Sequence, residues 1–143
     1  MKKFKLHWLV AATVLMCSAS LSAQAFLAIV AHPSNPTSGI TAHEAEQLFL
    51  GKTSELNGRR ASPIDQAPGS AARAKFLKSV LKKDEAEMSN YWSKLQFTGK
   101  AQPPREAQDD TGVKALIVAS PEAIGYVDGK SVDGSVKVLL IIP

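Results

Sequence analysis

One apolar run limits the folds that this chain can adopt. Residues 26–31 (FLAIVA) are continuously apolar, include β-branched side chains and end at His32-Pro33. A strand with one solvated face alternates apolar and polar residues, whereas a continuous run is typical of a strand buried on both faces. The sequence therefore predicts a sheet that is covered by helices on both sides.

The rest of the chain alternates helices with short strands. Thr41 and Glu44 form a predicted capping box for a helix that ends at Gly51. Further helices are expected over 70–82, from 84 onward and over 110–119, with strands over 61–64, 123–127 and 136–142 and polar loops over 52–60 and 99–104. This alternation favours an α/β layer arrangement in a single domain over a helical bundle.

Apolar side chains at helical spacing predict which helix faces pack on the sheet. They are Phe76, Leu77, Val80 and Leu81 in the second helix, Met88, Tyr91, Trp92 and Leu95 in the third, and Val113, Leu116, Ile117 and Val118 in the fourth. The lysines at 75, 78, 82 and 83 are expected on the solvated side of the second helix or near its end.

The first 25 residues are predicted to be a secretory signal peptide. They contain a basic start, an apolar segment (Leu6–Leu21) and a small-x-small cleavage site (Ala23-Gln24-Ala25). Serines near the end of the apolar segment disfavour a membrane anchor, and the large residue before Cys17 disfavours a lipidated cysteine. We expect cleavage after Ala25, export to the periplasm and a mature domain of residues 26–143.

The charge of this mature domain argues against two classes of partner. The whole chain holds 17 basic and 13 acidic residues, but three of the lysines lie in the signal peptide. The remaining net charge of about +1 gives no electrostatic basis for binding nucleic acid or an anionic membrane. The one cysteine also lies in the signal peptide, so neither disulfide bonds nor cysteine-ligated metals are expected.

Catalytic and metal-binding patterns are sparse. His32 and His43 stand eleven residues apart without further predicted ligands, and no serine hydrolase or nucleotide-binding motif is present. Asp109 and Asp110 could ligate a divalent cation, but we favour the interpretation that Asp110 or Thr111 caps the following helix. The sequence predicts a protein that is not an enzyme and uses no metal or cofactor.

The stretch Asp65–Leu77 carries the strongest chemical signal. It is predicted to be a strand that runs through a Pro-Gly-Ser turn into a helix, with Ser70 as the N-cap residue. The free backbone N–H groups and the positive end of the helix dipole make such a turn a seat for an anion. For this stretch alone, an ordinary capped helix is the alternative interpretation.

Four segments stand in a characteristic order along the chain. They are Ile40–Lys52, which ends in Phe-Leu-Gly-Lys, the Gly69-Ser70 turn with Phe76, the segment Tyr91–Lys100 with Pro103-Pro104, and Ala123–Val127 (AIGYV). Together they resemble the phosphate-binding (PstS-like) family of periplasmic substrate-binding proteins. The resemblance implies one lobe of a type 2 periplasmic-binding-protein fold, with a mixed sheet flanked by helices, that holds an oxyanion through hydroxyls, backbone N–H groups and an arginine.

The resemblance also implies a ligand site. Ala71 and Ala72 stand where the family's turn has a glycine and a threonine, and Gln66 stands where the family commonly has an arginine. Arg73 is the predicted replacement for the missing charge. The expected ligand residues are Gly69, Ser70, Ala71, Ala72, Arg73 and Gln66, with Ser34 and Asn35 at the end of the first strand.

The function implied by the resemblance is binding of phosphate or a similar oxyanion in the periplasm. The partner would be an inner-membrane ABC permease or another envelope protein. The mature domain has the length of one lobe, whereas transport proteins of this family close two lobes around the ligand, so weak binding is expected. The alternative is an envelope interaction or sensor-accessory module that has lost tight anion binding. The sequence leaves the oligomeric state open.

Overall fold

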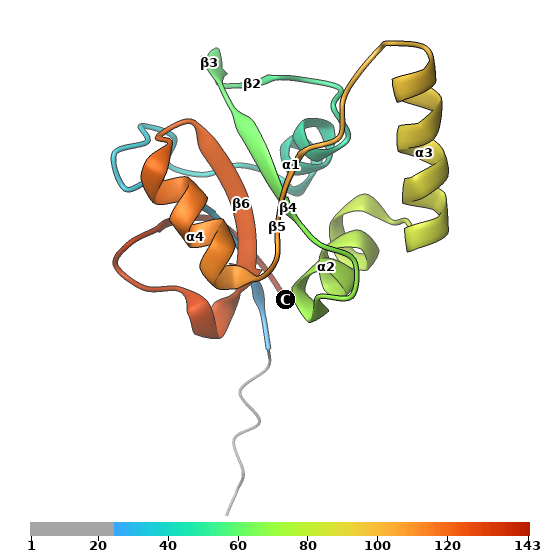
Figure 1. The fold of residues 1–143 in the computed structure, drawn as a ribbon. Helices are drawn as coiled ribbons and strands as arrows, with labels where there is room; N and C mark the ends of the chain where they lie inside the picture. Colours follow the sequence, from blue (N-terminus) through green and yellow to red (C-terminus); the bar gives the residue numbers. More distant parts are fainter. Residues whose placement is uncertain (1–24) are drawn as a thin grey trace, which may run out of the picture.

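The computed structural model describes residues 25–143, which Figure 1 shows as a ribbon. The predicted signal peptide lies outside the described residues, except for Ala25. None of the described helices is both long and apolar enough to cross a membrane. The strands are β1 (Leu27–Ala31), β2 (Glu55–Leu56), β3 (Arg59–Arg60), β4 (Ser62–Gln66), β5 (Arg105–Ala107), β6 (Ala123–Asp128) and β7 (Lys137–Ile142). The helices are α1 (Ala42–Phe49), α2 (Ala71–Phe76), the π-helix η1 (Leu77–Leu81), α3 (Glu85–Phe97), α4 (Asp110–Ala119) and the 3₁₀ turn η2 (Gly129–Ser131).

Five of the strands form one mixed sheet in the order β5-β4-β6-β1-β7. Strand β4 runs parallel to β5 and β6, and β1 runs antiparallel to β6 and β7. Strands β2 and β3 form a separate hairpin around Asn57-Gly58, where both residues have positive φ angles. In Figure 1 this hairpin lies at one end of β4 and α2 lies at the other. The predicted α/β class with a mixed sheet is confirmed.

Helices cover both faces of this sheet, as strand β1 illustrates. All five residues of β1 are buried. Leu27 and Ile29 belong to the larger core cluster, which α1, α2, η1 and α3 cover, whereas Ala28 and Val30 belong to the cluster under α4. Because successive side chains of a strand point to opposite faces, β1 serves both clusters. The prediction of a strand buried on both faces is confirmed.

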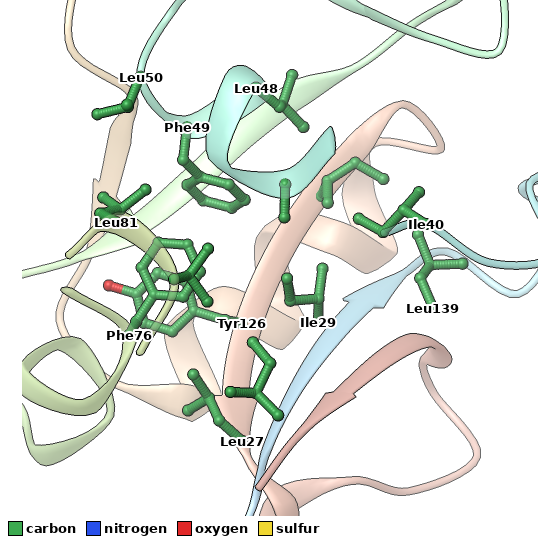
Figure 2. Close-up of a cluster of buried hydrophobic side chains, with 14 of the residues drawn as sticks. Leu27, Ile29, Ile40, Leu48, Phe49, Leu50, Phe76, Leu81, Tyr126 and Leu139 are labelled. Atoms are coloured by element: carbon green, nitrogen blue, oxygen red, sulfur yellow. The ribbon is translucent and has the colours of Figure 1, made fainter. Parts of the chain in front are cut away.

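Three aromatic rings lie together in the larger cluster (Figure 2). Phe76 of α2 stacks on Tyr126 of β6, with ring centroids 4.0 Å apart and an angle of 10° between the planes. Phe49 of α1 meets Phe76 at 4.7 Å and Tyr126 at 5.8 Å in edge-on or tilted geometry. These contacts join α1, α2 and β6, and they hold α2 against the sheet.

Strand β6 allows α4 to approach closely at Gly125. A Cβ atom on Gly125 would lie 2.5 Å from Val113 Cγ1 and 3.4 Å from Ile117 Cδ1, both on α4. A larger residue would have to push the helix or its side chains away from the sheet. The glycine of the AIGYV segment is therefore explained by packing.

Two helices differ in detail from the sequence prediction. The helix expected over 70–82 is an α-helix to Phe76 and a π-helix beyond it, and Lys82 then adopts a left-handed conformation with φ of 56°. In α4 the expectation that Val118 is part of the core is wrong, because Val118 is 54% exposed while Val113 and Ile117 face the sheet.

The sequence pattern predicts neither strand β5 nor the β2–β3 hairpin, since it assigns a polar loop to 52–60 and no element to 105–107. Strand β5 has the sequence Arg-Glu-Ala, with no alternation of apolar and polar residues. It pairs only with β4, at the edge of the sheet, and its first two residues are exposed. A short edge strand of this kind forms through pairing with its neighbour rather than through its own composition.

Candidate functional site

The turn between β4 and α2 has the predicted form. Gly69 has a φ of 95°, a conformation that side chains other than hydrogen disfavour. Ser70 caps α2, since its backbone is extended and its hydroxyl accepts a hydrogen bond from Arg73 N at 2.9 Å. The N–H groups of Ala71 and Ala72 have no acceptor among the described residues. The predicted N-cap is confirmed, and two backbone donors remain available to a ligand.

The side chain of Gln66 is fully committed inside the protein. Only 1% of Gln66 is exposed. Its Nε2 donates to Asp110 Oδ1 at 2.8 Å and to the carbonyl oxygen of Tyr126 at 2.9 Å, and its Oε1 accepts from Ser70 Oγ at 2.8 Å. Gln66 therefore joins β4, α2, α4 and β6. The hydroxyl of Ser70 is likewise used twice, once as donor and once as acceptor.

Arg73 points into the protein and forms ion pairs there. Its Nη1 donates to Asp65 Oδ2 at 2.8 Å and to the carbonyl oxygen of Gln66 at 3.0 Å. Its Nε and Nη2 bind the two carboxylate oxygens of Glu85 at 2.6 and 2.9 Å. Burial alone would lower the pKa of Arg73, but the hydrogen bonds with Glu85 and the charge of Asp65 outweigh it and raise the pKa above its ordinary value. Its charge is thus already matched by two carboxylates.

Asp65 and Tyr126 complete this buried network. The Tyr126 hydroxyl donates to Asp65 Oδ1 and accepts from Gln66 N at 3.1 Å. Burial first, and the negative charge of Asp65 second, raise the pKa of Tyr126 above its ordinary value, so the phenol stays protonated and remains a donor. Among the described residues no buried side-chain nitrogen or oxygen lacks a hydrogen-bond partner.

The N-terminus of α4 lies beside the turn and corrects one sequence interpretation. The cap of α4 is Asp109 and not Asp110 or Thr111, because the backbone of Asp109 is extended and its Oδ1 accepts the N–H of Gly112 at 2.9 Å. Asp110 instead accepts from Gln66 through Oδ1, and from Ser131 Oγ at 2.6 Å and Asp128 N at 3.2 Å through Oδ2. Within residues 25–143 no group of three or more histidine, cysteine or acidic side chains is placed to hold a metal ion.

The first turns of α2 and α4 open onto one surface pocket of about 390 Å³. The donors that line it and have no described acceptor include the N–H groups of Ala71 and Ala72, the amide of Gln108, the hydroxyl of Thr111 and the ammonium of Lys130. Three carboxylates line the same pocket. The full lining is Gln66, Ser70, Ala71, Ala72, Gln108, Asp109, Asp110, Thr111, Asp128 and Lys130. The pocket therefore combines the positive ends of two helix dipoles with an acidic rim.

The structure does not bring Ser34 and Asn35 to this pocket. The last residues of β1 pair with the first residues of β6, which also pair with the first residues of β4. These three strand ends therefore lie on the same side of the sheet. Gln66 is at the other end of β4, about 13 Å away for a rise of about 3.3 Å per residue. The side chain of Asn35 is bonded away from this pocket, since its Oδ1 accepts from Thr37 N at 2.9 Å and its Nδ2 donates to the carbonyl oxygen of Pro121 at 3.2 Å.

The predicted ligand residues thus fall into three groups. Gln66, Ser70, Ala71 and Ala72 line the pocket between α2 and α4. Arg73 lies behind it in buried ion pairs, and Gly69 shapes the turn without lining the pocket. Ser34 and Asn35 line a different hollow, at the opposite end of the sheet.

Sequence reasoning missed Glu85, Asp110 and Tyr126 as parts of the site. Tyr126 stands in the AIGYV segment, which contributes to the sequence resemblance. That segment does not indicate that Tyr126 contacts Asp65 and Gln66. Asp110 is 44 residues from Gln66 along the chain, and Tyr126 is 60 residues from it. No local pattern joins residues so far apart.

Sequence comparison finds no match to any known family model or curated protein. Comparison with solved structures places the fold among periplasmic binding proteins. An ABC-type phosphate transport receptor from Vibrio cholerae matches with a TM-score of 0.63 and 20% identity over 80% of this chain and 46% of its own. A substrate-binding protein from Clostridium perfringens, solved with bound phosphate, matches with a TM-score of 0.64 and 20% identity over 80% and 45%. PstS from Borrelia burgdorferi matches with a TM-score of 0.60 and 15% identity over 80% and 47%.

The chain therefore has the fold of one lobe of a periplasmic substrate-binding protein, with an α/β mixed sheet flanked by helices. This likeness in fold agrees with the sequence resemblance to the PstS-like proteins. The chain spans about half the length of the solved structures that it matches.

Proposed function

We propose that this chain is a periplasmic protein that binds phosphate, or a similar oxyanion, in the pocket at the first turns of α2 and α4. The observation that carries the proposal is the convergence of two helix N-termini on one pocket, where the N–H groups of Ala71 and Ala72 have no described acceptor. Lys130 supplies the cation that Arg73 does not, because Arg73 is paired with Asp65 and Glu85.

The acidic rim of the pocket bears on both affinity and selectivity. Asp109, Asp110 and Asp128 repel a fully ionised anion, so binding is weak. A protonated oxyanion can instead donate a hydrogen bond to one of these carboxylates. Hydrogen phosphate carries such a proton at neutral pH and sulfate does not. Phosphate is therefore favoured over sulfate.

The remaining assignments follow from the fold and the sequence together. The solved relatives are named as transport receptors and substrate-binding proteins, which supports a binding role rather than an enzymatic one. The predicted signal peptide supports export to the periplasm. An inner-membrane ABC permease, or another envelope protein, is the proposed partner.

The variant Ala71→Pro tests the pocket with little disturbance of the helix. Proline is well suited to the first helical position, and the preceding Ser70 already has φ of −71° and ψ of 139°, which proline accepts in its neighbour. The substitution removes one backbone donor. We expect phosphate affinity, measured by calorimetric titration, to fall about tenfold or more, as for the loss of a hydrogen bond to a charged group.

A matched control is Ala42→Pro at the first position of α1, where Thr41 has φ of −86° and ψ of 161°. It should bind phosphate as the wild type does. The proposal is contradicted if the wild-type protein shows no phosphate binding, if sulfate binds equally well, or if Ala71→Pro retains full affinity.

A second function is favoured by one observation, namely that the side chains of Gln66, Ser70 and Arg73 are all bonded within the protein. In this alternative the lobe is an envelope interaction or sensor-accessory module that has lost tight anion binding. Absent phosphate binding together with repeated recovery of one membrane protein from envelope extracts would select it.

A further inference from the structure

A second hollowed surface lies at the opposite end of the sheet from the oxyanion pocket. Three hollows of about 350, 600 and 670 Å³ adjoin one another there, and Ala61, immediately before β4, lines all three. Arg60 and Glu122 line both the first and the third, and Gln102 lines both the second and the third. The hollows therefore form one continuous depression, which we call the basic trough after the cations that line it, Lys52, Arg59, Arg60, Lys100 and Arg105.

The charge of the basic trough is unbalanced. All five cations are exposed. The carboxylates that line the same hollows are Glu55 and Glu122. In the part of the chain that the structure describes, ion pairs form at Arg73 and Lys114, so none of the five trough cations is paired with a described carboxylate. The mature domain is almost neutral overall, which makes this local excess of positive charge a feature of one surface.

The arrangement of these cations suits an extended chain better than a small ion. Arg59 and Arg60 are adjacent in β3 and both line the first hollow, while Arg60 also lines the third. Apolar side chains line the same hollows, among them Leu56 and Leu116. The five cations are spread over three adjoining hollows, more than one small ion can contact, whereas a polypeptide with repeated carboxylates can follow them.

From this charge complementarity we infer that the basic trough is a docking surface for an extended acidic segment of a partner protein. The inference does not depend on the oxyanion pocket, because no residue lines both surfaces. It goes beyond the proposed function in assigning a separate surface and the chemistry of its partner.

The chain offers an internal control for the effect of charge alone. Lys78, Lys82 and Lys83 line another hollow, beside η1 and α3, but Asp84, Glu85 and Glu87 line it as well. These lysines therefore lie in a balanced environment. The trough variant R60Q/K100Q/R105Q and the control variant K78Q/K82Q/K83Q each remove three positive charges from the protein surface.

The test is fluorescence anisotropy with a labelled poly-L-glutamate peptide and the chain that begins at Phe26. We expect binding that weakens steeply as the ionic strength rises from about 0.05 to 0.5 M. The trough variant should bind about tenfold more weakly, as expected for three exposed ion pairs lost together, and the control variant should bind within about twofold of the wild type. A neutral polyglutamine peptide of equal length should not bind.

Three results would overturn the inference. They are equal binding by the wild type and the trough variant, an equal loss in the control variant, and tighter binding to phosphatidylglycerol vesicles than to the peptide with the same sensitivity to the trough substitutions. Phosphate titration of the trough variant separates this surface from the oxyanion pocket, since its phosphate affinity should match that of the wild type.

Discussion

The substitution Arg73→Met removes the centre of the buried ion-pair network while it keeps an unbranched side chain. The side chains of Arg73 and Asp65 are 8% and 9% exposed, so the variant leaves a buried carboxylate without its cation. Loss of one partner from a buried ion pair costs about 3–5 kcal/mol. Asp65 keeps its hydrogen bonds from Tyr126 and Gln66 N, which places the expected loss near the lower end of that range.

The other partner of Arg73 supplies the comparison. The Glu85 side chain is 48% exposed, so water can solvate it when Arg73 is absent. We expect Glu85→Gln to cost no more than about 1 kcal/mol. The double variant D65N/R73M should be more stable than R73M alone, because it removes the unpaired charge.

Urea unfolding at neutral pH measures these differences as changes in the free energy of unfolding. Phosphate titration of each variant that stays folded then separates a structural role of Arg73 from a role in the ligand site. A loss below about 1 kcal/mol for Arg73→Met would refute the reasoning, because a buried pair should cost several times more. A variant of wild-type stability that no longer binds phosphate would show that Arg73 contacts the ligand after all.

Two further substitutions test the packing and hydrogen bonding around this network. Tyr126→Phe keeps the stacking on Phe76 but removes the hydroxyl that donates to Asp65. It should lower the free energy of unfolding by about 1.5–3 kcal/mol, and an unchanged urea midpoint would contradict this. Gly125→Ala places a methyl group against Val113 Cγ1 and should cost about 1–3 kcal/mol by the same measurement. Gly134→Ala, where a Cβ meets no atom within 4 Å, is its control and should be nearly neutral.

The elements that sequence predicts well are those with local causes. The capping box of Thr41 and Glu44 and the N-cap at Ser70 each depend on residues three positions apart. The cap of α4 is Asp109 rather than the predicted Asp110 or Thr111, since all three are suitable cap residues and only the backbone distinguishes them.

The parts of the site that sequence does not predict depend on strand direction and on distant partners. Ser34 and Asn35 would lie beside Gln66 only if β1 ran parallel to β4. Because β1 is antiparallel to β6 and β6 is parallel to β4, the end of β1 instead reaches the start of β4. An apolar run such as that of β1 carries no information on direction. Arg73 is similarly ambiguous, because its carboxylate partner Glu85 lies on the next helix.

The most direct test of the account is a titration of the ¹⁵N-labelled protein with phosphate, followed by two-dimensional NMR of the backbone amides. The account predicts that the resonances of Ala71 and Ala72 move first and furthest, with Thr111 and Lys130 beside them, and that sulfate at equal concentration moves them little. Shifts confined to Arg59 and Arg60, or no shifts at all, would contradict an oxyanion site at the first turns of α2 and α4.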